Sequence, residues 1–186
     1  VIDGKKVSGV TSMYMEKGLD TGDMLIKKEL PIGKETTAGE YHDALAVLGG
    51  NVLLETLDKL KEGTLSPEKQ DDSLSTYASQ LSKAEGEIDW NKTNEEIYNK
   101  VRGLNPWPKA FSFINGKRFV IDFVYECDEA GTAGEVLRAD ADGILVATGK
   151  GSVLIKELKV EGKKKMSAED YLRGHKIEKG TLLGGM

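Results

Sequence analysis

The hydrophobic pattern of this chain changes from helical spacing to strict alternation near residue 105. Apolar residues alternate along 111–113 and again along 119–125, and Asn115-Gly116 between them is the strongest two-residue signal for a β-hairpin. Five short strands joined by tight turns predict a small closed β-barrel in the second half of the chain. The remaining strands are expected at 134–139, 144–148 and 153–160, and a helix that plugs or flanks the barrel at 167–173.

A short helix is expected before these strands. Ile97, Val101 and Leu104 lie at helical spacing, and a Thr93–Glu96 pair precedes them at the spacing of a capping box. The segment Asn105-Pro106-Trp107-Pro108 then predicts a rigid helix-to-strand junction with the Trp107 ring buried.

The first half of the chain predicts a sheet fragment covered by two helices. Residues 7–14 and 25–28 have strand character, and Thr37-Ala38-Gly39-Glu40 has the pattern of a capping box at a helix start. Gly49-Gly50 is expected to break this helix. A second helix, expected to stop at Gly63, has a predicted packing stripe of Leu53, Leu57 and Leu60.

Residues 64–92 follow neither pattern and are rich in Ser and charged residues, so they predict a long linker. The side chains expected to anchor this linker against a domain are Tyr77, Leu81, Ile88 and Trp90. The predicted organisation is a first domain over residues 1–63, a linker over 64–92 and a second domain over 93–186.

One carboxylate lies in a loop between the first two predicted strands. Asp20 stands between Gly18 and Gly22, and such Gly-flanked loops at strand ends are where α/β folds collect their chemistry. Asp and Gly are also common in plain turns, and on spacing alone a structural hairpin turn is the commoner interpretation.

Several segments, taken in order, make the chain resemble a known family. They are Gly18-Leu19-Asp20-Thr21-Gly22-Asp23-Met24, Thr76-Tyr77-Ala78, the run over 81–90 that ends in Glu87-Ile88-Asp89-Trp90, Asn105-Pro106-Trp107-Pro108, and Lys163-Lys164-Lys165-Met166-Ser167-Ala168. Together they resemble the folate-dependent formyltransferases, and most closely the branch that acts on methionyl-tRNA. The resemblance covers essentially the whole chain.

The resemblance implies a fold of class α/β plus β. It implies the C-terminal fragment of a Rossmann-like catalytic domain over residues 1–63, a linker, and an oligonucleotide-binding-like (OB-like) β-barrel domain over 93–186 that binds tRNA. The implied reaction moves a formyl group from 10-formyltetrahydrofolate, as co-substrate, to the α-amino group of methionine on the initiator tRNA.

The resemblance also implies roles for the Asp20 loop. Asp20 matches the family's catalytic Asp, which holds a catalytic His in its charged form, and Gly18 and Leu19 match the backbone that borders the pteridine ring of the folate. The catalytic Asn and His of the family fall upstream of this sequence. We therefore expect an N-terminal part of the catalytic domain to be absent and the chain alone to be inactive.

For tRNA the resemblance implies contacts from the linker and barrel. Lys83 matches the family's linker lysine, and Lys163, Lys164 and Lys165 form the densest basic run, with Arg102 as a further candidate. A run of three lysines is also common in plain solvated loops. Residues 1–92 carry 11 Lys+Arg against 17 Asp+Glu, and residues 93–186 carry 15 against 14. We therefore expect tRNA contact to depend on local basic patches or on charge from the absent part of the protein.

The composition also limits which other kinds of protein and partner are expected. No apolar run approaches the ~20 residues of a membrane helix, and neither a metal nor DNA is expected as a partner. Cys127 is the only cysteine of the chain, which suits a reducing cytoplasm, and it is expected to be a core thiol rather than a nucleophile.

Two rival interpretations stay open. One is another enzyme of the same superfamily, either a formyltetrahydrofolate-handling relative or a sugar-nucleotide formyltransferase, since these share the Asp loop. The other is a non-catalytic RNA-binding module in which the barrel alone does the work. The intact Asp20 loop argues against the second, because a pure binding module has no use for it.

Overall fold

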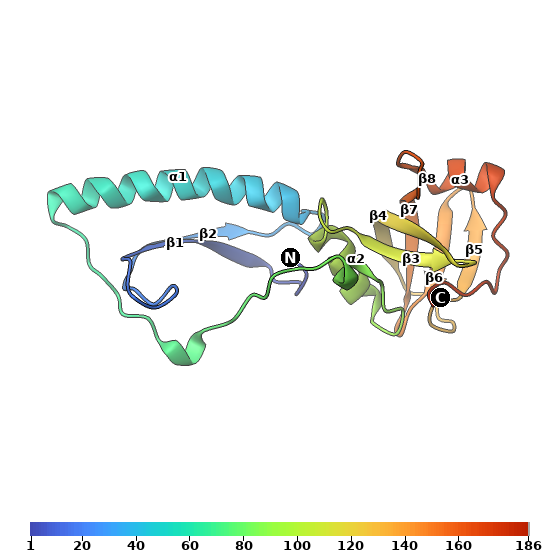
Figure 1. Cartoon of the computed structure of the whole chain (residues 1–186), viewed down its shortest axis with the longest axis horizontal. Coiled ribbons are helices and arrows are strands. Elements are labelled where there is room, and N and C mark those ends of the chain that lie inside the picture. Colours follow the sequence, from blue (N-terminus) through green and yellow to red (C-terminus); the bar gives the residue numbers. More distant parts are fainter. Residues whose placement is uncertain (186) are drawn as a thin grey trace. The chain divides into compact units, whose positions relative to one another are not determined.

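The computed structural model describes residues 1–185, which form two compact units. Residues 5–80 make one unit, here called the hairpin unit, and residues 1–4 join the chain from Leu81 onward in the other, here called the sheet unit. Each unit is described by itself below, and Figure 1 gives the labels of their elements.

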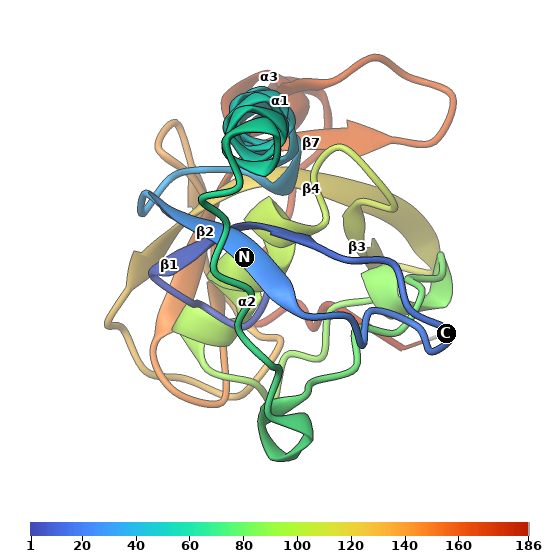
Figure 2. The same cartoon turned by 90° about the vertical axis from the view of Figure 1, so that its left-hand side faces the viewer.

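The hairpin unit consists of two antiparallel strands and one long helix. Strands β1 (Val7–Met13) and β2 (Met24–Pro31) pair from Val7 opposite Pro31 to Met13 opposite Met24. Helix α1 (Ala38–Glu62) lies along this two-stranded sheet, as Figures 1 and 2 show from two directions. The strands expected at 7–14 and 25–28 are therefore confirmed.

Both ends of α1 lie where the sequence predicts them, but the predicted break in its middle is absent. Thr37 and Glu40 form the capping box, and Gly63 ends the helix in the left-handed conformation with φ of 70°. The predicted break at Gly49-Gly50 is wrong, because α1 runs through both glycines. Each glycine costs a helix only about 1 kcal/mol relative to alanine, which is less than packing against a sheet contributes.

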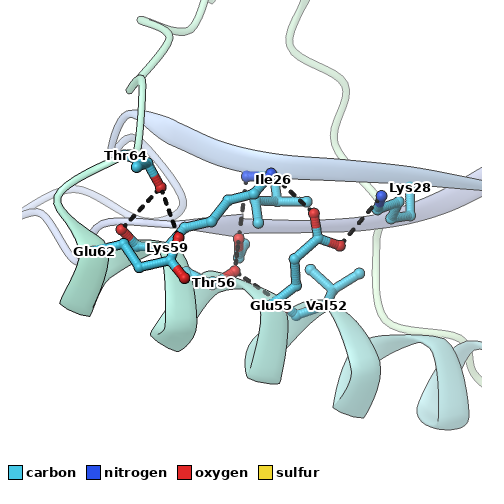
Figure 3. A network of polar contacts seen from close by, with 9 residues as sticks. Ile26, Lys28, Val52, Glu55, Thr56, Lys59, Glu62 and Thr64 are labelled. Carbon is cyan, nitrogen blue, oxygen red and sulfur yellow. Dashed lines mark hydrogen bonds and ion pairs between the residues drawn. The ribbon is translucent and has the colours of Figure 1, made fainter.

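The face of α1 that packs on the sheet is held by few residues. Val52 and Thr56 are buried, and Thr56 Oγ1 lies 2.8 Å from Ser12 Oγ on β1 while donating to the Val52 carbonyl at 2.7 Å. Glu55 pairs with Lys28 on β2 at 3.2 Å and with Lys59 one helical turn later at 3.0 Å. Figure 3 shows this network between the helix and β2.

The other face of α1 is apolar and exposed. This corrects the predicted packing stripe, because Leu53, Leu57 and Leu60 are 56%, 43% and 51% exposed. Val47 and Leu54 extend the same face, at 69% and 63%. The helix therefore has two apolar faces, of which the hairpin unit covers one.

The sheet unit begins with a helix that matches its prediction. Helix α2 (Asn94–Gly103) starts with the capping box of Thr93 and Glu96, and its apolar stripe is almost fully buried. The backbone N–H and the side-chain hydroxyl of Thr93 both donate to the Glu96 carboxylate. These two hydrogen bonds hold the pKa of the Glu96 carboxyl below its usual range.

One antiparallel sheet carries most of this unit. Its strand order is β3-β4-β7-β6-β5, and a short strand β8 that was not predicted pairs with β7. The strands are β3 (Ala110–Ile114), β4 (Lys117–Cys127), β5 (Val136–Asp140), β6 (Gly143–Ala147), β7 (Ser152–Val160) and β8 (Met166–Ser167), followed by helix α3 (Ala168–Gly174). Within residues 1–185 no strand pairing joins β3 to β5, so the ladders define a large antiparallel sheet without demonstrating a closed barrel.

The tight turn between β3 and β4 is the one that the sequence predicts. Asn115 and Gly116 have φ of 48° and 71°, as a turn with two positive-φ positions requires. The sheet's core includes Val136, Val146 and Val153, each 0% exposed.

The predicted linker divides between the two units. Residues 64–80 belong to the hairpin unit and contain a short 3-10 helix, η1 (Asp72–Leu74), while the segment from 81 contains η2 (Ala84–Gly86). Ile88 and Trp90 are buried against the sheet unit as expected, whereas Tyr77 is 88% exposed and anchors nothing.

The Asn105–Pro108 segment connects α2 to β3 as predicted, but the Trp107 ring is not buried. Trp107 is 55% exposed, which corrects the prediction. The two prolyl bonds of this segment, Asn105–Pro106 and Trp107–Pro108, are cis.

Candidate functional site

The loop between β1 and β2 is closed tightly at its base. The Tyr14 N–H donates to the Asp23 carbonyl at 3.0 Å. A Cβ on Gly22 would lie 1.7 Å from the Tyr14 carbonyl oxygen, so only glycine fits at this position. The glycine of the motif therefore has a structural reason, which is close approach of two backbone segments.

The loop presents Asp20 to solvent. Gly18, Leu19 and Asp20 lie together on the exposed part of the turn, with Leu19 84% exposed, and Asp20 has a positive φ of 53°. Asp is one of the few non-glycine residues that adopt this conformation as a single residue, at a cost of at most roughly 1–2 kcal/mol. The three residues predicted to border the folate are thus brought together on one turn.

An exposed carboxylate of this kind can accept hydrogen bonds or pair with a cation. Both histidines of the chain are engaged elsewhere: His42 Nδ1 lies 3.1 Å from Asp43 on α1, and His175 stacks on Tyr171 with ring centroids 4.4 Å apart. Neither of these contacts involves Asp20.

One residue that contacts this loop lies outside all of the predicted motifs. Gln70 Nε2 donates to the Asp20 carbonyl and to the Gly22 carbonyl, at 2.7 Å each. Gln70 is 50 residues from Asp20 along the chain and belongs to no motif noted above. No pattern in the sequence indicates it, because Gln70 reaches the loop from beside an isolated bridge between Met24 and Glu68.

The basic residues predicted to contact tRNA lie in the sheet unit. Lys83 is exposed at the start of η2, and Lys163, Lys164 and Lys165 are exposed on the turn between β7 and β8. Lys165 pairs with Glu157 at 2.6 Å, and that hydrogen bond raises the pKa of the Lys165 ammonium.

Strand register adds two cations to the lysine turn. Phe119 on β4 pairs with Val160 on β7, so Lys117 and Arg118 lie at the same end of the sheet as the turn over 161–165. The Arg118 guanidinium carbon is 4.0 Å from the centroid of the Phe111 ring, which holds this side chain on the sheet surface.

Arg102 differs from the other candidates. It is 7% exposed, and its Nε donates to Asn99 Oδ1 at 2.8 Å within α2. Its guanidinium carbon also lies 5.7 Å from the Tyr98 ring centroid. The side chain is thus largely buried in the sheet unit, and its role in binding tRNA stays a prediction.

The described part of the chain contains neither a cluster of metal-ligating side chains nor a helix that could span a membrane. No group of three His, Cys, Asp or Glu side chains in residues 1–185 is arranged to hold a metal ion. Over the same residues, no helix combines the length and the apolar character that crossing a membrane requires.

Known protein families match both units. The model described as "Formyl transferase" matches residues 1–57, and "Formyl transferase, C-terminal domain" matches residues 80–176. The methionyl-tRNA formyltransferase of Ruminiclostridium cellulolyticum is 47% identical over 190 residues, covering 99% of this chain and 60% of that protein. The chain spans about 60% of the length of the curated relatives it matches.

Solved structures share the fold at lower identity. HypX from Aquifex aeolicus in complex with tetrahydrofolic acid has a TM-score of 0.65 and 21% identity, covering 97% of this chain and 35% of that one. An N-formyltransferase from Helicobacter canadensis, in complex with folinic acid and dTDP-3-aminofucose, has a TM-score of 0.66 and 20% identity, covering 83% and 56%. At such identities the likeness concerns the fold alone.

Proposed function

The chain belongs to the formyl transferase family, and from that premise we propose that the full-length protein transfers a formyl group from 10-formyltetrahydrofolate to the amino group of methionyl-initiator tRNA. The observation that carries this proposal is 47% identity over 99% of the chain to a methionyl-tRNA formyltransferase. An enzyme of translation initiation works in the cytoplasm, which is the compartment we propose.

The two units suggest how the activity is divided. We assign residues 1–63 to the C-terminal part of a Rossmann-like catalytic domain, 64–92 to the linker and 93–186 to an OB-like barrel that binds tRNA. The strand order β3-β4-β7-β6-β5 is compatible with such a barrel.

The exposed apolar face of α1 supports the first assignment. The helix packs on the two-stranded sheet with one face only and leaves five large apolar side chains of the other face 43–69% exposed. We propose that the upstream part of the same catalytic domain covers Val47, Leu54 and Leu57 in the full-length protein, since relatives are longer than this chain. Leu57→Glu should then lower the thermal stability of the full-length protein while leaving that of this chain nearly unchanged, and equal effects in both would contradict the assignment.

The reaction requires charge stabilisation and two proton movements. The amine attacks the formyl carbon, the bond from that carbon to the folate nitrogen breaks, and the oxygen carries negative charge in between. The amine gives up a proton, and the departing nitrogen receives one directly or through water. The products are formyl-methionyl-tRNA and tetrahydrofolate.

Asp20 has the chemistry to assist this step. We propose that its carboxylate pairs with the imidazolium of the family's catalytic His, since an opposite charge within ~4–6 Å favours the protonated ring. The protonated ring is the better donor to the developing oxyanion. The exposed position of Asp20 leaves its carboxylate open to such a partner. We propose that the chain alone does not catalyse transfer, since it spans about 60% of the length of its curated relatives.

Binding of the two substrates is assigned to separate units. The exposed Leu19 side chain and the Gly18 backbone offer an apolar edge for the pteridine ring of the folate. Lys83, Lys163, Lys164 and Lys165 are proposed to contact phosphates, which position a nucleic acid without reading its sequence.

The test is formyl transfer by the full-length protein with methionyl-tRNA and with a nucleotide-linked amino sugar. We expect turnover only with the tRNA, and Asp20→Asn should lower kcat by about 10²–10⁴-fold, the usual range for a group that assists proton transfer. Asp23→Asn, in the same loop, serves as the control with a small effect. Transfer to the sugar would favour the rival enzyme, and tRNA binding without any transfer would favour an RNA-binding module.

A further inference from the structure

Gln70 makes two short hydrogen bonds to backbone carbonyls with one side-chain amide, whose Nε2 also lies 3.9 Å from the Met13 sulfur. Its Nε2 lies 2.7 Å from the Asp20 carbonyl oxygen and 2.7 Å from the Gly22 carbonyl oxygen. Two acceptors can be satisfied only by the NH₂ group, because the amide oxygen would repel both carbonyls. The amide therefore spans the turn that carries Asp20, using both of its hydrogens.

The segment that supplies Gln70 is itself fixed to β2. Met24 and Glu68 exchange two backbone hydrogen bonds, each 2.8 Å, and the Glu68 carboxylate pairs with Lys27 at 2.9 Å. Residue 70 is two positions beyond this bridge, so its backbone starts from an anchored point. The side chain is half-buried, in contrast to the exposed residues around it.

The Asp20 turn needs support of this kind. Tyr14 and Asp23 join the base of the loop, but the residues from 15 to 21 are exposed. Asp20 holds a positive φ, which is unfavourable for a residue with a Cβ. Two hydrogen bonds on the carbonyls of Asp20 and Gly22 fix the peptide planes between residues 20 and 21 and between residues 22 and 23, and so limit how the Asp20 side chain can turn away.

We propose that Gln70 is a positioning residue for Asp20: it holds the backbone of the loop so that the carboxylate meets its catalytic partner in a productive geometry. This inference rests on the proposed function of Asp20. It also gives residues 64–80 a purpose besides connecting two units, which is to brace one wall of the folate site.

The test uses Gln70→Met, which keeps the side-chain length and removes both donors, in the full-length protein. We expect kcat to fall by about 10- to 100-fold, the effect of a displacement on the order of 1 Å in a reacting geometry, with KM for methionyl-tRNA unchanged. Gln70→Glu, which can only accept hydrogen bonds, should behave alike if the Met variant folds poorly. Gln80→Met, at an exposed glutamine of the same segment, is the matched control.

A double-mutant cycle separates positioning from a general structural role. In an Asp20→Asn background, Gln70→Met should have little further effect on kcat, because the group that it positions is already gone. A full additional loss in that background, or a kcat for Gln70→Met equal to that of Gln80→Met, would overturn the inference.

A second readout does not need activity. Backbone amides of residues 15–23 should exchange with deuterium faster in Gln70→Met than in Gln80→Met, in this chain as in the full-length protein. Unchanged exchange would also overturn the inference. If the wild-type protein formylates no tRNA while exchange still responds to Gln70, the proposed function fails and the bracing of the loop stands.

Discussion

The indole Nε1 of Trp90 donates a hydrogen bond to Oγ of Ser112, 3.0 Å away, and the two residues are 5% and 0% exposed. The bond fastens the end of the predicted linker to β3. Ser112→Ala leaves a buried N–H without an acceptor, which should lower the free energy of unfolding by about 1–3 kcal/mol. Urea denaturation followed by Trp fluorescence measures the change.

The control for this prediction is Ser79→Ala, at an exposed serine. A cycle with Trp90→Phe tests the pair itself, because Ser112→Ala should cost less once the indole N–H is absent. Equal effects of Ser112→Ala with and without Trp90 would show that the hydroxyl acts through another contact.

A second prediction concerns a largely buried ion pair at the start of the sheet. Lys109 Nζ contacts the carboxylate of Asp122 and lies 2.8 Å from Asn105 Oδ1, and the side chains of Lys109 and Asp122 are 29% and 6% exposed. Lys109→Met leaves the buried Asp122 carboxylate without its cationic partner, so we expect the free energy of unfolding to fall by about 3 kcal/mol. Chemical denaturation checks it, with Lys163→Met on the exposed turn as the control, and a loss no larger than that of the control would contradict it.

Local patterns were enough to predict the element ends. Both capping boxes, the left-handed Gly63 and the Asn115-Gly116 hairpin depend on residues within four positions of one another, so the sequence alone carries the signal. The Asp20 loop was likewise predicted from Gly18 and Gly22. The catalytic role of Asp20 stays a prediction, because it comes from the family resemblance.

Features set by tertiary packing could not be predicted in this way. Arg102, a candidate for tRNA contact, is buried. Its Nε donates to Asn99 Oδ1, and its guanidinium lies over the Tyr98 ring. Trp107 was expected to be buried and is exposed. Gln70 acts across 50 residues of chain, a distance over which no periodicity carries information.

The continuity of α1 through Gly49 and Gly50 makes a third prediction. A Cβ at Gly50 would meet no atom within 4 Å, and Gly50 lies in the exposed middle of the helix. Gly50→Ala should therefore stabilise the hairpin unit of this chain by about 1 kcal/mol, the difference in helix propensity.

Thermal unfolding followed by circular dichroism measures this gain. Gly22→Ala is the opposite case, since its Cβ would lie 1.7 Å from the Tyr14 carbonyl oxygen, and it should destabilise the unit. A destabilising Gly50→Ala would mean that the exposed face of α1 has an occupant in this chain.

The last prediction concerns the reactivity of Cys127. Partial burial, and then the negative charge of Glu129, raise the pKa of this thiol above its usual range. Since only the thiolate attacks a disulfide reagent, the fraction that reacts at pH 8 should be smaller than for a free cysteine. The reaction with a small aromatic disulfide should therefore speed up only at higher pH, and the midpoint of its pH–rate curve reports the pKa. Glu129→Gln should move that midpoint to lower pH, because it removes a nearby negative charge. Glu161→Gln, on the turn between β7 and β8, is the control and should leave the midpoint unchanged. A midpoint at or below that of free cysteine would contradict the prediction, because it would show that the thiol is more exposed to solvent than its surroundings indicate.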